Sequence, residues 1–593
     1  MIAPGVTDPQ KGERLSLREE VLRAAVQNAL RYGEAKPGPV VGKVMAAHPE
    51  LRSRAREVWS LAEEVVREVN SMGEEELLRL AEELGVVEAR RERREERRWP
   101  PLPEADRFEV IVTRVAPEPN GYPHFGHVKG LIVPFVYARM YGGRFLLRFE
   151  DTNPRVERLE YYEAIREEFA EVLEAAEREL GLSPGRWDEE IVESDHLEEF
   201  YEKARQLILQ GDAYVCTCPA RVVRAKRARG EPCEHRDQSP EENLELWEQM
   251  LSGEFSEGEA HLRLRTDMRH PNLTMRDPGI FRIIEHPHPI HGDRYRVYPT
   301  YDFAVSVMDS LTGVTHAFRS KEFEPHVEVQ KTILRRLGLR DVVMIQFGRL
   351  TVEGLPLSKR YIRPLIESGV LEGWDDPRIP TLRGLKRRGI TYEALVRFLF
   401  DMGPSKVDAA VSMDALAAYN RKYLDPITPR YMFVPNPISL EVYGAPPRLV
   451  AELPVHPNRR EMGVRRIEID APQGVFKVYV PYSDVRSAQP GERIRLRGLA
   501  NVRIRSVMPD AATAVYEPEK DLSVKIVQWA PADGSVPCVA IVPETPYSYR
   551  VVGGYGEPAM SELREGEIVH LVRFGFARVD SAGGSLRLIV PHS

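Results

Sequence analysis

The sequence predicts a multidomain α/β protein in which a parallel-sheet domain is interrupted by an insertion. Three patterns carry this prediction. Apolar residues recur at helical spacing, with almost no strand signal, over residues 15–98. From residue 108, β-rich apolar segments alternate with helices, which is typical of a parallel sheet. After residue 430, short alternating runs punctuated by Pro and Gly predict antiparallel β-barrels.

A chain of 593 residues is long for one hydrophobic core, and at roughly 100–200 residues per domain it suggests about three to five domains. We place the boundaries where the residue pattern changes. The expected parts are a helical N-terminal domain at 1–100, a parallel-sheet domain in two halves at 101–212 and 296–365, an inserted domain at 213–295, a helical connecting subdomain at 366–430 and a β-barrel region at 431–593.

The composition describes a globular protein without a membrane role. Hydrophobic residues make up 42% and charged residues 29% of the chain, and no apolar run approaches the roughly 18 residues that span a bilayer. The first 20 residues have neither the apolar core of a secretory signal nor the composition of a transit peptide. We therefore expect a cytoplasmic protein.

The net charge of −8 conceals several basic clusters. For any one of them, a solvated and salt-bridged helix face is the simpler interpretation. Because local potential steers association, five clusters in different regions favour an extended polyanion such as nucleic acid as a partner. The clusters are Ala89–Arg98, Arg221–Arg229, Arg383–Gly389, Asn458–Arg466 and Arg493–Arg505.

The stretch PEPNGYPHFGH places two histidines, His124 and His127, where a predicted strand ends and a helix begins. Free backbone N–H groups and the helix dipole favour phosphate at such a position. Gly126 removes a side chain from the turn, so that a ligand can approach the backbone. Imidazoles three residues apart share one helix face and can donate to a phosphate. A structural histidine pair is the alternative.

A second candidate is Leu357-Ser358-Lys359-Arg360, which lies in a Gly- and Pro-marked loop after a predicted strand. Adjacent Lys and Arg side chains in a mobile loop suit a pyrophosphate leaving group, because cations there stabilise the charge that develops in the transition state. A plain surface loop with two basic residues is the alternative.

A third candidate is a metal site in the insertion, formed by a Cys-X-Cys and a Cys-X-His clip. Two such clips separated by 14 residues can close on one tetrahedral ion, and three sulfurs with one nitrogen indicate structural zinc. Because the segment is polar, we expect the ion to fix its fold. The expected ligands are Cys216, Cys218, Cys233 and His235.

Together, HFGH and LSKR resemble the HIGH and KMSKS signatures of the class I aminoacyl-tRNA synthetases. The surrounding sequence is similar to the glutamyl/glutaminyl branch of this class, in segments such as RFEDTNP, YPTYDFAVSVMDSLTGVTHAFRSKEF and GWDDPRIPTLRGLKRRG. The helical N-terminal extension and the β-rich C-terminus look like those of the archaeal glutamyl enzymes of this branch. The resemblance is dense over residues 108–430 and architectural elsewhere. It implies a Rossmann-like catalytic domain that charges tRNA at the expense of ATP, with Mg²⁺ assisting the phosphates.

The resemblance implies that four residues of this sequence bind ATP. Three of these, His124, His127 and Lys359, are also the expected catalytic residues. Pro356 stands where the first lysine of KMSKS would be, so one usual loop charge is missing. We expect Arg349 or Arg360 to compensate for it. The four positions are His124, Gly126, His127 and Lys359.

The resemblance also implies a glutamate pocket formed by Arg114, Glu150, Tyr301 and Arg319. Glutamyl enzymes place an arginine at the position of Arg319, whereas glutaminyl enzymes usually have a small uncharged residue. A buried guanidinium facing a neutral amide would lack a counter-charge, which agrees with glutamate. The turn PEPNGY is closer to the glutaminyl version, and Val305 stands where bacterial glutamyl enzymes have a hydrogen-bonding Asn, so a glutaminyl-tRNA synthetase stays the alternative.

The expected partners are L-glutamate and tRNA(Glu). We expect the insertion to bind the acceptor stem and the β-barrels to bind the anticodon. We expect the protein to be a monomer. Whether tRNA(Gln) is also charged stays open. Two other classes compete. A small nucleotidyltransferase shares an HxGH turn, but length, the zinc insertion and the barrels argue against it. A non-catalytic tRNA-binding paralogue is disfavoured by the intact His124, His127 and Lys359.

Overall fold

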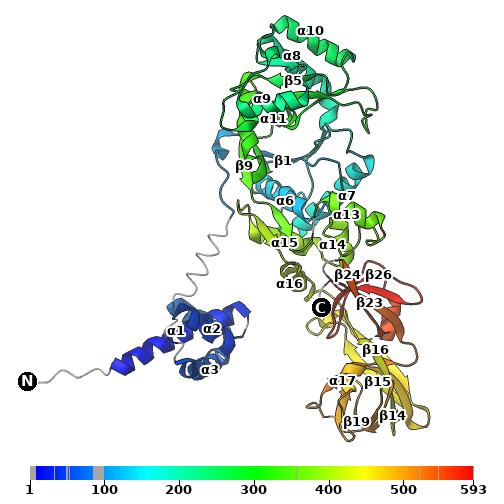
Figure 1. Ribbon diagram of the computed structural model, residues 1–593. Helices are drawn as coiled ribbons and strands as arrows, with labels where there is room; N and C mark the ends of the chain where they lie inside the picture. Colours follow the sequence, from blue (N-terminus) through cyan, green and yellow to red (C-terminus); the bar gives the residue numbers. More distant parts are fainter. Residues whose placement is uncertain are drawn as a thin grey trace, which may run out of the picture. The chain divides into compact units, whose positions relative to one another are not determined.

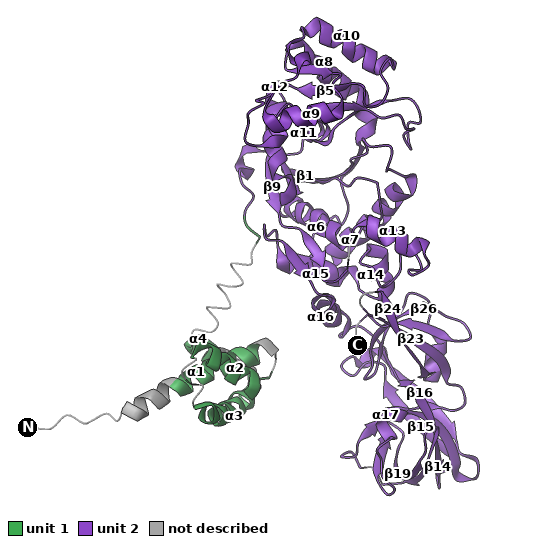
Figure 2. Ribbon diagram, viewed as in Figure 1, with its two compact units in different colours: residues 1–100 green, residues 101–593 purple. Residues whose placement is uncertain are grey.

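The computed structural model describes residues 9–32, 34–48, 51, 54–84, 99–355, 357–519, 521–544 and 547–591. The chain forms two compact units, residues 1–100 and 101–593, which are described separately (Figure 2). None of the helices in the described ranges combines the length and the apolar character that crossing a membrane requires.

The first unit is helical, as predicted. Its apolar core includes Val21, Val40 and Val65, which come from three different helices. On the surface, Arg18 forms ion pairs with Glu64 and Glu68 at 2.7 and 2.6 Å. The basic cluster Ala89–Arg98 lies outside the described residues. The helices are α1 (Pro9–Tyr32), α2 (Pro37–Ala47), α3 (Ala55–Ser71) and α4 (Glu74–Glu83).

A parallel sheet forms the centre of the second unit, again as predicted (Figure 1). Strand β1 pairs in parallel with β2, β2 with β3, and β8 with β9. The Thr315 N–H donates to the Val112 carbonyl at 2.8 Å and brings β8 beside β1. The strands are β1 (Val112–Val115), β2 (Arg144–Phe149), β3 (Glu189–Val192), β8 (His316–Ser320) and β9 (Val343–Phe347). The helices between them are α6 (Phe125–Met140), α7 (Leu159–Leu180), α8 (Leu197–Leu209), α11 (Tyr301–Leu311) and α12 (Val327–Arg336).

The insertion is more regular than its sequence pattern suggests. It contains a four-stranded antiparallel sheet in the order β4-β5-β6-β7 and packs into the same apolar core as the parallel sheet, through side chains such as Trp247 and Phe281. Because the strands are only three to five residues long, they offer too few alternations to be recognised. The elements are β4 (Ala213–Cys216), α9 (Ala220–Arg229), α10 (Pro240–Ser252), β5 (His261–Leu264), β6 (Gly279–Ile283) and β7 (Val297–Pro299).

The connecting region is helical, and its basic cluster at 383–388 makes intramolecular contacts. Arg387 forms a two-point ion pair with Asp580, with nitrogen-to-oxygen distances of 2.8 and 3.0 Å. Buried Arg388 donates to the Pro377 and Pro591 carbonyls, both at 3.2 Å. These side chains hold the region together. Its elements are β10 (Leu350–Val352), α13 (Lys359–Glu367), α14 (Leu382–Arg388), α15 (Tyr392–Met402), β11 (Ala409–Val411) and α16 (Met413–Leu424).

The remaining chain forms two seven-stranded curled sheets and a two-stranded hairpin (Figure 1). The predicted β units are confirmed, although some pairs, such as β14 with β20 and β23 with β27, are parallel. One sheet has β12 (Arg430–Tyr431), β25 (Ile568–Leu571), β26 (Gly575–Ser581), β27 (Leu586–Ile589), β23 (Val536–Glu544), β24 (Ser548–Gly556) and β13 (Phe433–Pro435). The other has β21 (Ile526–Val527), β18 (Arg493–Leu496), β19 (Ala500–Val507), β20 (Ala511–Glu517), β14 (Pro437–Tyr443), β17 (Val475–Pro481) and β22 (Ala530–Pro531). The hairpin pairs β15 (Arg448–Pro454) with β16 (Val464–Asp470), and the short helix α17 (Tyr482–Val485) follows β17.

Gly348, which lies between β9 and β10, tests how closely this turn approaches the backbone at Val407. A Cβ atom at this residue would lie 2.1 Å from the Val407 carbonyl oxygen, so the Gly348→Ala variant should lose about 1–3 kcal/mol of unfolding free energy through overpacking. A Cβ at Gly130, inside α6, would lie 3.7 Å from Phe347, which is ordinary contact. The Gly130→Ala control should therefore melt at or above the wild-type temperature. Equal thermal shifts in the two variants would contradict this account.

Candidate active site and metal centre

His124 and His127 form the N-terminal cap of α6. The Gly126 N–H donates to Nδ1 of His124 at 3.1 Å, and the His124 N–H donates to Nδ1 of His127 at 3.2 Å. The two rings stack with their centroids 3.7 Å apart. Because both Nδ1 atoms accept hydrogen bonds, each neutral ring carries its proton on Nε2.

Desolvation keeps both rings neutral. Burial, and then the neighbouring His127, lower the pKa of His124 well below its usual value. Desolvation also lowers the pKa of His127 to about 4, although the residue as a whole is exposed. At neutral pH the pair therefore offers two Nε2–H donors at a helix N-terminus, a combination suited to phosphate oxygens.

The LSKR segment lies against the HFGH turn. A Cβ at Gly126 would come within 3.1 Å of Cδ1 of Leu357 and 3.0 Å of the His124 ring, so any larger residue would have to displace these side chains. Lys359 begins α13 and donates through Nζ to the Asn120 carbonyl at 2.6 Å. The structure thus brings together two motifs that are far apart in the chain. Pro356, expected to replace a lysine, lies outside the described residues.

Arg349 and Arg360 have contacts away from the two histidines. Arg349 forms an exposed ion pair with Glu322 at 2.6 Å, and its backbone N–H donates to Asp408 at 2.7 Å. The guanidinium of Arg360 lies over the ring of Tyr361, 4.6 Å from its centroid. These contacts do not test the suggested role of the two arginines beside ATP, which stays a prediction.

Arg114 and Arg319 converge on one buried carboxylate, Asp309 of α11. Arg114 in β1 contacts Asp309 through Nε and Nη2, at 2.9 and 3.1 Å. Arg319 in β8 contacts the same carboxylate through Nη2 at 2.9 Å and also donates to Gln330. The expected pair is therefore assembled from two neighbouring parallel strands and joined by a residue that sequence analysis did not select.

A third buried arginine, Arg148 of β2, completes the cluster. It donates to Asp309 at 2.6 Å and to Glu150 at 3.1 Å, and its Nε lies 3.6 Å from Glu193. Burial alone would raise the pKa of Asp309, but the three guanidinium groups lower it well below its usual value. Arg319 therefore has a counter-charge within the protein, so its burial does not by itself require a substrate carboxylate.

Tyr301 lies at the start of α11, beside this cluster. Its ring centroid is 5.9 Å from the guanidinium carbon of Arg319, and burial raises the pKa of its hydroxyl to about 12. Glu150 follows β2 directly and accepts from Arg148. All four residues expected to bind glutamate therefore lie around one part of the parallel sheet.

The four expected metal ligands form one cluster in the insertion, with all ligand atoms within 4.8 Å of one another. Sγ of Cys216 lies 3.7 Å from Sγ of Cys233, and Sγ of Cys218 lies 3.4 Å from Nδ1 of His235. With Zn–S bonds of about 2.3 Å, two sulfurs on a tetrahedral ion lie roughly 3.8 Å apart. These donors fit zinc. Thr217 contacts Nε2 of His235 at 3.0 Å and orients the ring, as partners of metal-bound histidines do.

Comparisons with known proteins decide the family. The model of the catalytic domain of class I tRNA synthetases (E and Q) matches residues 110–426, and the model of the anticodon-binding domain of these enzymes matches residues 428–524. The chain belongs to this family. A glutamate–tRNA ligase of Korarchaeum cryptofilum is 62% identical over 95% of this chain and 97% of its own length. Those of Pyrococcus abyssi and Thermofilum pendens are each 41% identical over 95% of this chain and 97% and 98% of their own lengths.

In this class I tRNA synthetase, three of the four expected glutamate-binding residues lie on or directly after parallel strands, and Tyr301 begins α11. Arg114 and Arg319 lie in β1 and β8, and Glu150 follows β2. Ligands of open parallel sheets commonly bind at the carboxyl ends of strands. Sequence analysis missed Asp309 and Arg148, although each has a detectable signal, since each is a charged residue inside a largely apolar strand or helix.

The metal centre of the synthetase can be tested by removing one thiolate. Cys233→Ser should abolish stoichiometric zinc in protein purified without chelators, because the oxygen of serine is a poor substitute for a buried thiolate. Elemental analysis would measure the zinc, and a lower melting temperature should accompany its loss. As a control, Cys538→Ser changes a buried cysteine of β23 outside this cluster and should keep one zinc per chain. Wild-type protein purified without zinc would contradict the assignment.

The Nε2–H donor of His127 can be tested separately. His127→Ala should lower kcat for amino-acid activation by about 10²-fold or more, since loss of one preorganised donor to developing charge has that effect. His127→Gln places an amide N–H near the original Nε2 position and should recover part of the loss. Steady-state ATP-pyrophosphate exchange measures both. Identical activity in the two variants would argue that the ring acts only in packing.

Proposed function

We propose that this protein is an ATP-dependent ligase that attaches L-glutamate to tRNA(Glu). One observation carries the proposal. The same parallel sheet bears a turn suited to phosphate, which follows β1, and two buried arginines, which lie in β1 and β8. The relatives named glutamate–tRNA ligase, which match nearly the whole chain, support glutamate as the amino acid. The glutaminyl alternative is not favoured.

His124, Gly126, His127 and Lys359 handle ATP in this proposal. The neutral Nε2–H groups of the histidines donate to phosphate oxygens, and Gly126 leaves the backbone open to the nucleotide. The ammonium group of Lys359 exchanges its contact with the Asn120 carbonyl for the phosphates. These side chains are nitrogen donors, so Mg²⁺ would enter on the phosphates of ATP, which is its usual mode of binding in nucleotide sites.

Arg114 and Arg319 receive the side-chain carboxylate of glutamate, and Glu150 receives the α-ammonium group. Tyr301 borders the side-chain end of the pocket. Guanidinium groups bind carboxylates at two points, whereas an amide offers one acceptor and a repelling N–H pair. Three buried arginines in the pocket therefore favour glutamate over glutamine.

The reaction then follows from positioning. An oxygen of the α-carboxylate attacks the α-phosphorus of ATP, the bond to pyrophosphate breaks, and glutamyl-adenylate forms. The terminal ribose hydroxyl of tRNA attacks the acyl carbon, loses its proton, and AMP leaves. The protein contributes orientation and charge stabilisation. Zinc, held by Cys216, Cys218, Cys233 and His235, would stabilise the insertion without taking part in these steps.

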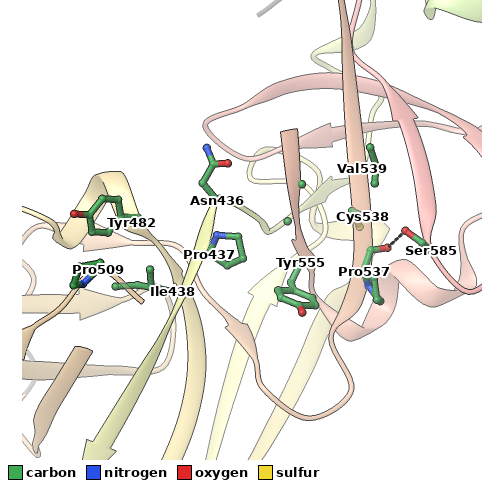
Figure 3. A pocket seen from close by; sticks show the side chains of 12 residues that line it. Asn436, Pro437, Ile438, Tyr482, Pro509, Pro537, Cys538, Val539, Tyr555 and Ser585 are labelled. Atoms are coloured by element: carbon green, nitrogen blue, oxygen red, sulfur yellow. Dashed lines mark hydrogen bonds between the residues drawn. The ribbon is translucent and has the colours of Figure 1, made fainter. Parts of the chain in front are cut away.

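The tRNA would extend from the insertion to the β sheets. We assign the acceptor stem to residues 213–295 and the anticodon to residues 431–593. A pocket of about 530 Å³ between the two seven-stranded sheets supports the second assignment (Figure 3). Tyr482 and Tyr555 line it, and the ring of Tyr555 stacks on Tyr479 with the centroids 4.2 Å apart. Such rings suit unstacked bases.

We propose further that the protein acts as a monomer in the cytoplasm. The same reaction could also charge tRNA(Gln) with glutamate, since this would use the same amino-acid pocket and would differ only in the tRNA. It would be decided by the tRNA contacts, for which the pocket of Figure 3 is the candidate region.

Aminoacylation with labelled glutamate or glutamine on purified tRNA(Glu) and tRNA(Gln) tests the function. The expected product is glutamyl-tRNA(Glu), and glutaminyl-tRNA would overturn the proposal. Arg319→Cys should reduce kcat/KM for glutamate by about 10²-fold or more through loss of a buried charged partner, with little change in KM for ATP. Equal losses for both substrates would show that Arg319 acts in folding rather than in the pocket.

A further inference from the structure

Asp309 binds every guanidinium group of the amino-acid pocket. Its side chain is 2% exposed, and its two oxygens accept four hydrogen bonds. A carboxylate offers about four acceptor sites, so Asp309 is saturated. The donors are Nε and Nη2 of Arg114 at 2.9 and 3.1 Å, Nη1 of Arg148 at 2.6 Å and Nη2 of Arg319 at 2.9 Å.

We propose that Asp309 is the positioning residue that makes the pocket select glutamate over glutamine. It holds Arg114 and Arg319 in the orientation that receives a carboxylate, and it sets the net charge of the cluster. The inference rests on the proposed function, because it assigns this pocket to the amino acid.

The orientation argument follows from the contacts of the two arginines. Within the described part of the chain, Asp309 is the ion-pair partner of both Arg114 and Arg319. The edge of Arg114 formed by Nε and Nη2 faces Asp309, which leaves Nη1 for a ligand. Arg319 is held by Asp309 on Nη2 and by Gln330 on Nη1, while its buried Nε has no partner. Without Asp309, Arg114 would lose the contact that fixes its rotamer.

The charge argument follows from the acidic groups nearby. Asp309 and Glu150 offset two of the three arginine charges. Glu193 adds little, because burial raises its pKa well above the usual value. The three guanidinium groups thus outnumber the two carboxylates that accept hydrogen bonds from them, which favours a ligand with a side-chain carboxylate. The neutral amide of glutamine would leave this excess uncompensated.

The two arguments give opposite expectations for Asp309→Asn. If charge alone mattered, loss of one negative charge would strengthen glutamate binding. If positioning matters, the Asn amide nitrogen faces guanidinium N–H groups, the arginines shift, and glutamate binding weakens. We expect the second result, since a bidentate contact depends on the fixed fork of the guanidinium group.

The experiment uses the full chain and measures charging of tRNA(Glu) with glutamate and with glutamine. Asp309→Asn should raise KM for glutamate at least tenfold, lower the ratio of kcat/KM for glutamate to that for glutamine by at least tenfold, and change KM for ATP less than twofold. Asp309→Glu keeps the carboxylate and should fall between this variant and the wild type. A lower or unchanged glutamate KM in Asp309→Asn would overturn the proposal.

Asp309→Asn alone leaves three buried cations and risks unfolding, so a charge-matched variant completes the test. Asp309→Asn combined with Arg148→Met removes one charge of each sign. Arg114 and Arg319 are both retained in this variant, but they lack the carboxylate that orients them. Positioning predicts the same tenfold losses in this variant, once its melting curve shows a folded protein. Wild-type KM and selectivity would overturn the inference. If the wild-type enzyme itself does not charge glutamate, the proposed function fails instead.

Discussion

The buried carboxylate of Asp309 is the interaction on which the arrangement of the active site depends. Helix α11 carries it, and the guanidinium groups that it binds come from β1, β2 and β8. Buried charges are costly unless they are paired and hydrogen-bonded, so this network restricts how the three strands and the helix can be assembled. The proposed amino-acid pocket would thereby form as part of the folding of the parallel sheet.

The HFGH turn is held by a different kind of contact, between backbones. The Phe125 N–H donates to the Pro380 carbonyl at 2.9 Å, and the Leu382 N–H donates to the Pro123 carbonyl at 3.0 Å. Helix α14 begins at Leu382 and reaches β26 through the Arg387–Asp580 ion pair. One short segment therefore contacts both the HFGH turn and a β sheet of the C-terminal region.

Several features were predictable from sequence because they depend on local patterns. The helical N-terminal unit, the parallel sheet and the β-rich C-terminus follow from apolar periodicity. The Cys/His cluster follows from cysteine spacing, and the HFGH turn from its place between a strand and a helix. The regular sheet of the insertion escaped detection, because its strands are too short to show alternation. The basic cluster at 383–388 suggested a polyanion partner, whereas Arg387 and Arg388 bind within the chain.

The sequence by itself determined the order of the helical, parallel-sheet and β-rich regions, the family, and which residues make up the HFGH and LSKR motifs. Tertiary structure decided which charges meet. Asp309 lies far from Arg114 and Arg148 in the chain, and nothing in the spacing of these residues shows that they share one carboxylate. A buried ion pair depends on distances of a few ångströms between elements, and those distances are set only when β1, β2, β8 and α11 pack against one another.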